Sequence, residues 1–109
     1  MPARLALASS DTHSQSVSTE ASQSVDVRFR IVATADAGML SRLLETFAKL
    51  GETPSYFLAR AVADGTEFSV ELRGERLAPR TAELIEFGLR RVLGVHHLVT
   101  LTEPSVAGN

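Results

Sequence analysis

The sequence predicts an α+β sandwich in which strands and helices follow one another in the order β-α-β-β-α-β. Three observations lead to this prediction. Apolar and polar residues alternate in residues 25–33 and 66–74, which is the period of a strand with one buried face. Apolar residues recur at helical spacing in the two segments that follow these strands. Glycine and proline stand at the boundaries between segments, where they punctuate secondary structure.

The first strand is expected over residues 25–33 and the first helix directly after it. In the strand, the side expected to be buried consists of Val25, Val27, Phe29, Ile31 and Ala33. Asp36 is the expected N-cap of the helix, and Gly51 is placed to end it in a left-handed conformation. The apolar stripe of the helix consists of Leu40, Leu43, Leu44, Phe47 and Leu50.

A hairpin is expected next. Residues 54–63 form its first strand, with Pro54 at the entrance, where a missing N–H does least harm. Asp64 and Gly65 are a typical pair for a two-residue turn, and residues 66–74 form the second strand.

The second helix and a closing strand complete the order. Pro79 suits the first turn of a helix, and Gly94 suits the end of the segment. The helix's apolar stripe consists of Ala82, Ile85, Leu89 and Val92. Residues 95–103 form the last strand.

Right-handed crossovers in both β-α-β units give a ferredoxin-like sandwich, with a four-stranded antiparallel sheet and both helices on one face. The folded domain is expected to span residues 25–103. Residues 1–24 are dominated by Ser, Thr, Ala and Gln, a composition typical of a disordered tail. Residues 104–109 are expected to form a short C-terminal tail.

Composition narrows the function. The 109 residues carry a net charge of −2 and contain no cysteine, which excludes disulfides and cysteine-based metal sites. That charge gives no general attraction to nucleic acid or to an anionic membrane. No apolar run is long enough to cross a bilayer, and we expect a cytoplasmic protein.

The open face of the sheet shows no catalytic or RNA-binding pattern. An RNA-recognition domain needs aromatic rings there, whereas Arg28, Arg30 and Glu71 indicate a solvated face of mixed charge, or one that pairs with its like across a two-fold axis. His96 and His97 are adjacent, so on a strand they should point to opposite faces, one partly buried and one exposed, and cannot share a metal. We therefore predict no enzyme activity, no cofactor and no metal site.

The segment ADAGML, from Ala35 to Leu40, joins the first strand to the first helix. Unpaired N–H groups and the positive end of the helix dipole make such a position receptive to a carboxylate. The alternative is that Gly38 only eases the turn.

This segment resembles the ACT domain, a small β-α-β-β-α-β module through which amino acids regulate metabolic enzymes. The places that match the family's opening pattern are Asp36, Gly38, Leu40, Leu43, Phe47 and Gly51. The resemblance runs from Val25 to Glu103. Ala37 stands where the family commonly has proline, and Thr53 where it commonly has an effector-binding asparagine. The implied effector site consists of Asp36, Ala37, Gly38, Met39, Leu40 and Thr53.

The resemblance also implies partners. A chain that is little more than one such module is similar to the short small subunits of acetolactate synthase, which are non-catalytic partners of a thiamine-diphosphate-dependent large subunit in branched-chain amino acid synthesis. ACT modules commonly pair side by side through edge strands. Residues 54–63 form an edge strand here, and Tyr56, Leu58 and Val62 are more apolar than an unpaired edge should expose. Phe87, off the main stripe of the second helix, should also be exposed.

Three functional hypotheses follow. The leading one is a homodimeric regulatory module that binds an amino acid effector and acts on the large catalytic subunit of a biosynthetic enzyme. The second keeps the dimer and the partner but has no effector. The third is an enzyme that uses the open face of the sheet.

Overall fold

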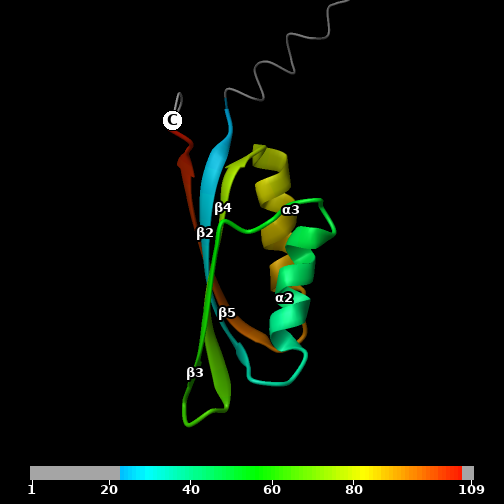
Figure 1. Cartoon of the computed structure of the whole chain (residues 1–109), viewed down its shortest axis with the longest axis vertical. Coiled ribbons are helices and arrows are strands. Elements are labelled where there is room, and N and C mark those ends of the chain that lie inside the picture. The colour runs from blue at the N-terminus through cyan, green and yellow to red at the C-terminus, as the bar shows by residue number, and fades with distance from the viewer. Residues whose placement is uncertain (1–22, 107–109) are drawn as a thin grey trace, which may run out of the picture.

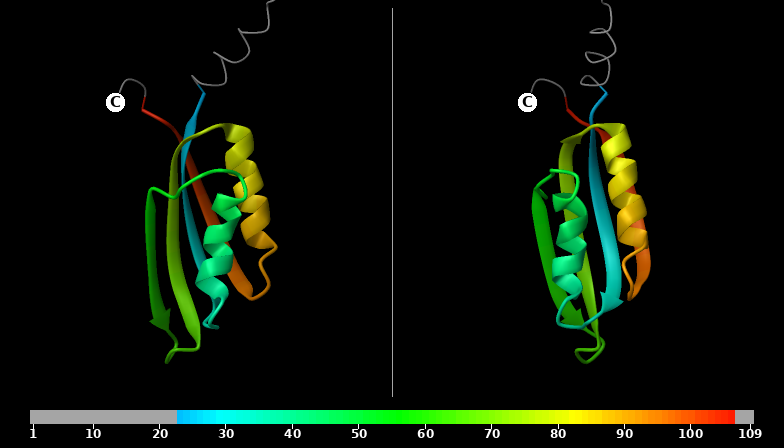
Figure 2. Two further views of the ribbon diagram at one scale, coloured as in Figure 1. Left: turned by 45° about the vertical axis from the view of Figure 1, so that its right-hand side comes forward. Right: turned by 90° about the vertical axis from the view of Figure 1, so that its right-hand side faces the viewer.

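The computed structural model describes residues 23–106, so nearly all of the tail expected at residues 1–24 lies outside the described residues, as do residues 107–109. The elements, in chain order, are β2 (Val25–Thr34), α2 (Met39–Ala48), β3 (Tyr56–Val62), β4 (Glu67–Leu77), α3 (Pro79–Arg90) and β5 (Val95–Pro104). The strands form one antiparallel sheet in the order β3-β4-β2-β5, and both helices cover the same face of it (Figures 1 and 2). The predicted ferredoxin-like fold is confirmed.

The core lies between the sheet and the two helices. Phe29 of β2 and Phe47 of α2 meet edge to face, with ring centroids 6.1 Å apart, a favoured arrangement for buried aromatic pairs. The buried residues are Val27, Phe29, Ile31, Ala33, Met39, Leu43, Phe47, Val70, Leu72, Leu77, Ala82, Ile85 and Leu89. This set follows the period-2 pattern of the central strands and one stripe of each helix.

Helix α2 is shorter than its apolar pattern suggested. It begins at Met39, which is fully buried, and ends before Leu50, which is 38% exposed and does not join the core. Gly51 has a φ of 73°, so it adopts the predicted left-handed conformation just after the helix.

The connection between β3 and β4 differs from the expected two-residue turn. Four residues, 63–66, separate the strands, and Ala63 and Asp64 share a positive φ with Gly65. Three successive residues thus have positive φ, one more than the two left-handed positions of a type I′ two-residue turn.

Strand β4 continues to Leu77, beyond the predicted end at Gly74. A bulge makes this extension possible: Arg76 has a φ of 55°, and the register with β2 shifts between Val25 and Val27. At the β5 edge of the sheet, β5 reaches Pro104, and the N–H of Ser105 donates to the carbonyl of Ser24 at 3.0 Å. No helix among residues 23–106 is both long and apolar enough to span a membrane.

Candidate functional site

The loop between β2 and α2 is held against the β3–β4 connection. The N–H of Ala35 donates to the carbonyl of Thr66 at 3.1 Å, and the N–H of Asp36 donates to the carbonyl of Thr34 at 2.9 Å. The N–H of Met39 donates to the carbonyl of Asp36 at 3.1 Å. The loop is therefore ordered by backbone contacts at the end of the sheet where β2, β3 and the start of β4 meet.

Asp36 does not cap the helix in the predicted manner. The N-cap is Gly38, and Oδ1 of Asp36 accepts its N–H at 3.0 Å, two residues along the chain. Arg42, one turn into the helix, donates from Nη2 to Oδ1 at 3.2 Å and to Oδ2 at 3.1 Å. The Asp36 carboxylate thus binds a backbone N–H of its own loop and the side chain of Arg42. Short side chains such as Asp commonly accept from a backbone N–H two residues along the chain.

The first turn of α2 keeps donors available. Among the described residues, the N–H groups of Leu40 and Ser41 make no hydrogen bond to backbone or side chain. Those groups lie at the positive end of the helix dipole. The Asp36 carboxylate, which Arg42 also contacts, and these N–H groups belong to the same loop and first helical turn, so the segment offers an acceptor for an ammonium group and donors for a carboxylate.

The other residues of the expected site differ in their access to this place. Met39 is fully buried in the core, so only its backbone can contribute, whereas Asp36 and Ala37 are exposed and Gly38 and Leu40 are half-buried. A Cβ built on Gly38 would lie 2.8 Å from Nη1 of Arg42. A side chain there would push the guanidinium away from Asp36.

Thr53 lies at the far end of α2 from Gly38. It is exposed and follows the left-handed turn at Gly51. A helix of ten residues rises about 15 Å. A single chain therefore does not bring Thr53 to the Asp36–Leu40 segment.

Charged side chains on the open face of the sheet form ion pairs around Glu71. Glu71 accepts from Nε of Arg73 at 2.7 Å, and its Oε2 lies 3.4 Å from Nε of Arg28. The hydrogen bond from Arg73 and the charges of the neighbouring arginines lower the pKa of the Glu71 carboxyl. The guanidinium of Arg73 also stacks over the ring of Tyr56, 4.1 Å from its centroid. The expected solvated, mixed-charge face is what the structure contains.

The two histidines do not point to opposite faces, contrary to the prediction. The register of β5 against β2 runs from His97 opposite Val32 to Val95 opposite Ala33, so His96 is an extra residue in a bulge. Both histidines are exposed, and Nε2 of His96 lies 2.9 Å from Oγ1 of Thr34. Within the part of the chain that the structure describes, no group of three or more His, Cys, Asp or Glu side chains is placed to hold a metal.

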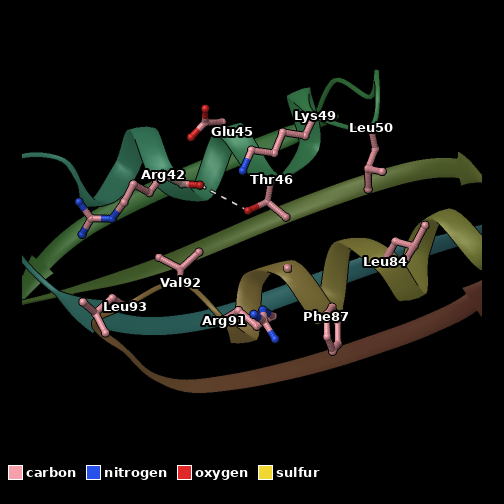
Figure 3. A pocket seen from close by; sticks show the side chains of 11 residues that line it. Arg42, Glu45, Thr46, Lys49, Leu50, Leu84, Phe87, Arg91, Val92 and Leu93 are labelled. Atoms are coloured by element: carbon pink, nitrogen blue, oxygen red, sulfur yellow. Dashed lines mark hydrogen bonds between the residues drawn. The ribbon is translucent and has the colours of Figure 1, made fainter.

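A groove between α2 and α3 was not predicted. Its volume is about 480 Å³, and it opens on the helical side of the molecule, away from the sheet (Figure 3). Its lining is Arg42, Glu45, Thr46, Lys49, Leu50, Leu84, Phe87, Gly88, Arg91, Val92 and Leu93. The exposure predicted for Phe87 is confirmed, and it was the one sequence signal that pointed to this surface.

Comparisons with known proteins agree with this fold. A family model described as an ACT-like domain matches residues 19–105. The crystal structure of the ACT domain from GTP pyrophosphokinase of Chlorobium tepidum superposes with a TM-score of 0.57 and 19% sequence identity, covering 70% of this chain and 96% of that one. The solution NMR structure of the same domain gives a TM-score of 0.53 and 22% identity, covering 70% of this chain and 84% of that one. No curated protein matches the sequence.

Proposed function

The chain belongs to the ACT-like domain family, and from that premise we propose that it is a non-catalytic regulatory module that binds an amino acid. The observation that carries this proposal is that one segment holds both the Asp36 carboxylate and the N–H groups of Leu40 and Ser41, which have no hydrogen-bond partner among the described residues. The ligand's ammonium group would pair with Asp36, and its carboxylate would accept from the helix N-terminus.

Thr53 can complete this site only across a two-fold axis. Strand β3 ends at Val62, which pairs with Glu67, the neighbour of Thr34 at the end of β2. An antiparallel copy of β3, added to this edge, would place the partner's strand start beside that end. Thr53 of the partner subunit would then approach the Asp36 loop, so the effector would be held between subunits. A homodimer through β3 is therefore part of the proposal.

Binding between subunits provides a regulatory mechanism. An amino acid that contacts both chains favours the dimer arrangement in which both halves of its site meet, and a bound enzyme responds to that shift. From the resemblance of the sequence to the short small subunits of acetolactate synthase, we propose the large catalytic subunit of a cytoplasmic biosynthetic enzyme of that type as the partner.

Titration calorimetry of the full chain with valine, leucine, isoleucine and the other common amino acids tests the proposal. We expect saturable binding by at least one of them and stabilisation of about 2.7 kcal/mol at a hundredfold excess over the dissociation constant. Asp36→Ala should abolish both effects. Asp64→Ala is the matched control, because it removes an exposed carboxylate from the β3–β4 loop. Equal binding by the wild type and Asp36→Ala would contradict the proposed site.

A second function has its own support. Arg42 donates to both oxygens of Asp36, and Thr53 lacks the paired groups of an amide. A subunit that activates its enzyme only through an interface would show these features. In that case a well-folded dimer would show no thermal shift with any amino acid.

A further inference from the structure

Large apolar side chains are exposed on the helical side of the molecule. In the groove between α2 and α3, Leu84 is 36% exposed and Phe87 is 60% exposed, while Leu93 at the groove's end is 87% exposed. These side chains flank a floor in which Gly88 contributes no side chain and Thr46 lies directly opposite. Contiguous exposed apolar surface of this kind marks an interaction site.

The ionisable side chains around the groove are distributed unevenly. Elsewhere on α3, Arg80 pairs with Glu83 at 3.5 Å and Arg90 pairs with Glu86 at 2.8 Å. Within residues 23–106, neither Lys49 nor Arg91 forms an ion pair. Of the three cations that line the groove, Arg42 pairs with Asp36 at 3.1 Å, whereas Lys49 and Arg91 are left without a counter-ion among residues 23–106.

The cationic side chains lie closer to the groove than the acidic side chain of Glu45 does (Figure 3). In Figure 3, Lys49 leans toward Thr46 on the groove side of α2, whereas Glu45 points away from α3. The guanidinium of Arg91 lies 5.2 Å from the ring centroid of Phe87, so a cation covers the most accessible aromatic ring of the groove. The groove therefore has an apolar floor and a cationic rim.

We infer that this groove docks an amphipathic helix of a partner protein, with an apolar stripe for the floor and acidic residues on its flanks. A helix laid between two antiparallel helices buries residues at i, i+3, i+4 and i+7 against their side chains. Gly88 and Thr46 close the floor against each other, since a Cβ on Gly88 would lie 2.7 Å from Cγ2 of Thr46, so the partner's side chains would pack on either side of that contact. Acidic flanks would meet Lys49 and Arg91, which have no other counter-ion in the described residues.

A second copy of the chain fits this surface less well. If two such faces came together, Lys49 and Arg91 of one chain would lie near the same cations of the copy. Repulsion between like charges would then weaken the association. The inference rests on the proposed function, since it names the surface through which a regulatory module would hold its partner. It needs no amino acid effector.

The test uses the full-length chain labelled with ¹⁵N and a synthetic amphipathic peptide of about 16 residues, with leucines at i, i+3, i+4 and i+7 spacing and glutamates on both flanks. We expect saturable shifts of the Thr46 and Gly88 amide signals. Phe87→Asp should weaken binding at least tenfold, because it removes the main apolar anchor. Leu101→Asp, at an exposed apolar site on the opposite face of the molecule, should not.

Charge reversal separates docking from non-specific adhesion. Arg91→Glu should weaken the glutamate-flanked peptide and strengthen a lysine-flanked one. Equal binding of both peptides by the wild type would overturn the inference. So would self-association that Phe87→Asp abolishes, or Phe87-dependent binding to phosphatidylserine vesicles, because each would assign the groove to another occupant.

Amino acid titration of the same samples keeps the two proposals apart. Peptide binding without amino acid binding would contradict the proposed effector site and support the proposed docking groove. Amino acid binding without peptide binding would do the reverse.

Discussion

Asp26 joins three segments that are distant in sequence. Its Oδ1 accepts from the N–H of Arg76 at 3.0 Å and from Oγ of Ser105 at 2.7 Å. The hydrogen bond from the Arg76 backbone, aided by the one from Ser105, lowers the pKa of this carboxyl from its ordinary value of 3.8. The ionised side chain therefore ties the bulge of β4 and the end of β5 to β2.

This lowered pKa predicts an acid-sensitive component of stability. A carboxyl whose pKa falls on folding stabilises the protein fully above its unfolded pKa and loses that contribution as pH falls through the folded one. Urea unfolding from pH 7 to pH 2 should show the loss below about pH 4. Asp26→Asn should lower stability at pH 7 and show a smaller fall in acid, with the remainder coming from Glu71, whose pKa is also lowered.

Glu103→Gln is the control for this experiment. Glu103 lies opposite Asp26 on β5, and its side chain makes no hydrogen bond within the described residues. The Glu103 variant should keep the acid sensitivity of the wild type. An unchanged acid-induced loss in Asp26→Asn would show that the two hydrogen bonds do not favour the ionised form. Sequence alternation placed Asp26 on the open face, but its partners depend on a bulge and on Ser105, 79 residues away.

At the scale of elements, α2 and α3 are in close contact at Gly88. A Cβ there would lie 2.7 Å from Cγ2 of Thr46. Gly88→Ala gains helix propensity of about 1 kcal/mol, but crowding costs about 1–3 kcal/mol. We expect net destabilisation in the wild type and net stabilisation in a Thr46→Ala background, measured by chemical unfolding. Additive effects of the two substitutions would contradict this contact.

The sequence predicted the type and order of every element, because the alternating and helical periods are long and unmixed. The prediction is wrong where a single residue changes the face on which a side chain lies or the residue at which a helix begins or ends. The extra residue His96 brings both histidines to exposed positions, and no local signal announces a bulge of this kind. Met39 enters the core and Leu50 does not, because α2 starts after Gly38 and the chain turns away at Gly51.

The candidate site was predictable only in part. The loop from Asp36 to Leu40 is identifiable from its position between strand and helix. The bond from Arg42 to Asp36 was not, because it depends on how a flexible side chain folds back across the first turn. The groove required knowledge of how α2 and α3 pack together.

At the scale of the whole molecule, the two free edges of the sheet differ in how well they are protected against association. The β5 edge carries a bulge at His96 and ends in Pro104, and bulges and proline both discourage strand pairing. The β3 edge has neither feature. The proposed homodimer should therefore form through β3.

Leu58 and Val99 allow a matched test of this prediction. They lie in one row across the sheet, since Leu58 pairs with Glu71, Glu71 with Arg30 and Arg30 with Val99. Leu58→Lys should convert the dimer to a monomer in sedimentation velocity, because a two-fold pairing brings two ammonium groups together on one face. Val99→Lys adds the same charge at the other edge and should leave the dimer intact. Dissociation by Val99→Lys alone would place the interface on β5, and Thr53 of the partner subunit could then no longer reach the Asp36 loop.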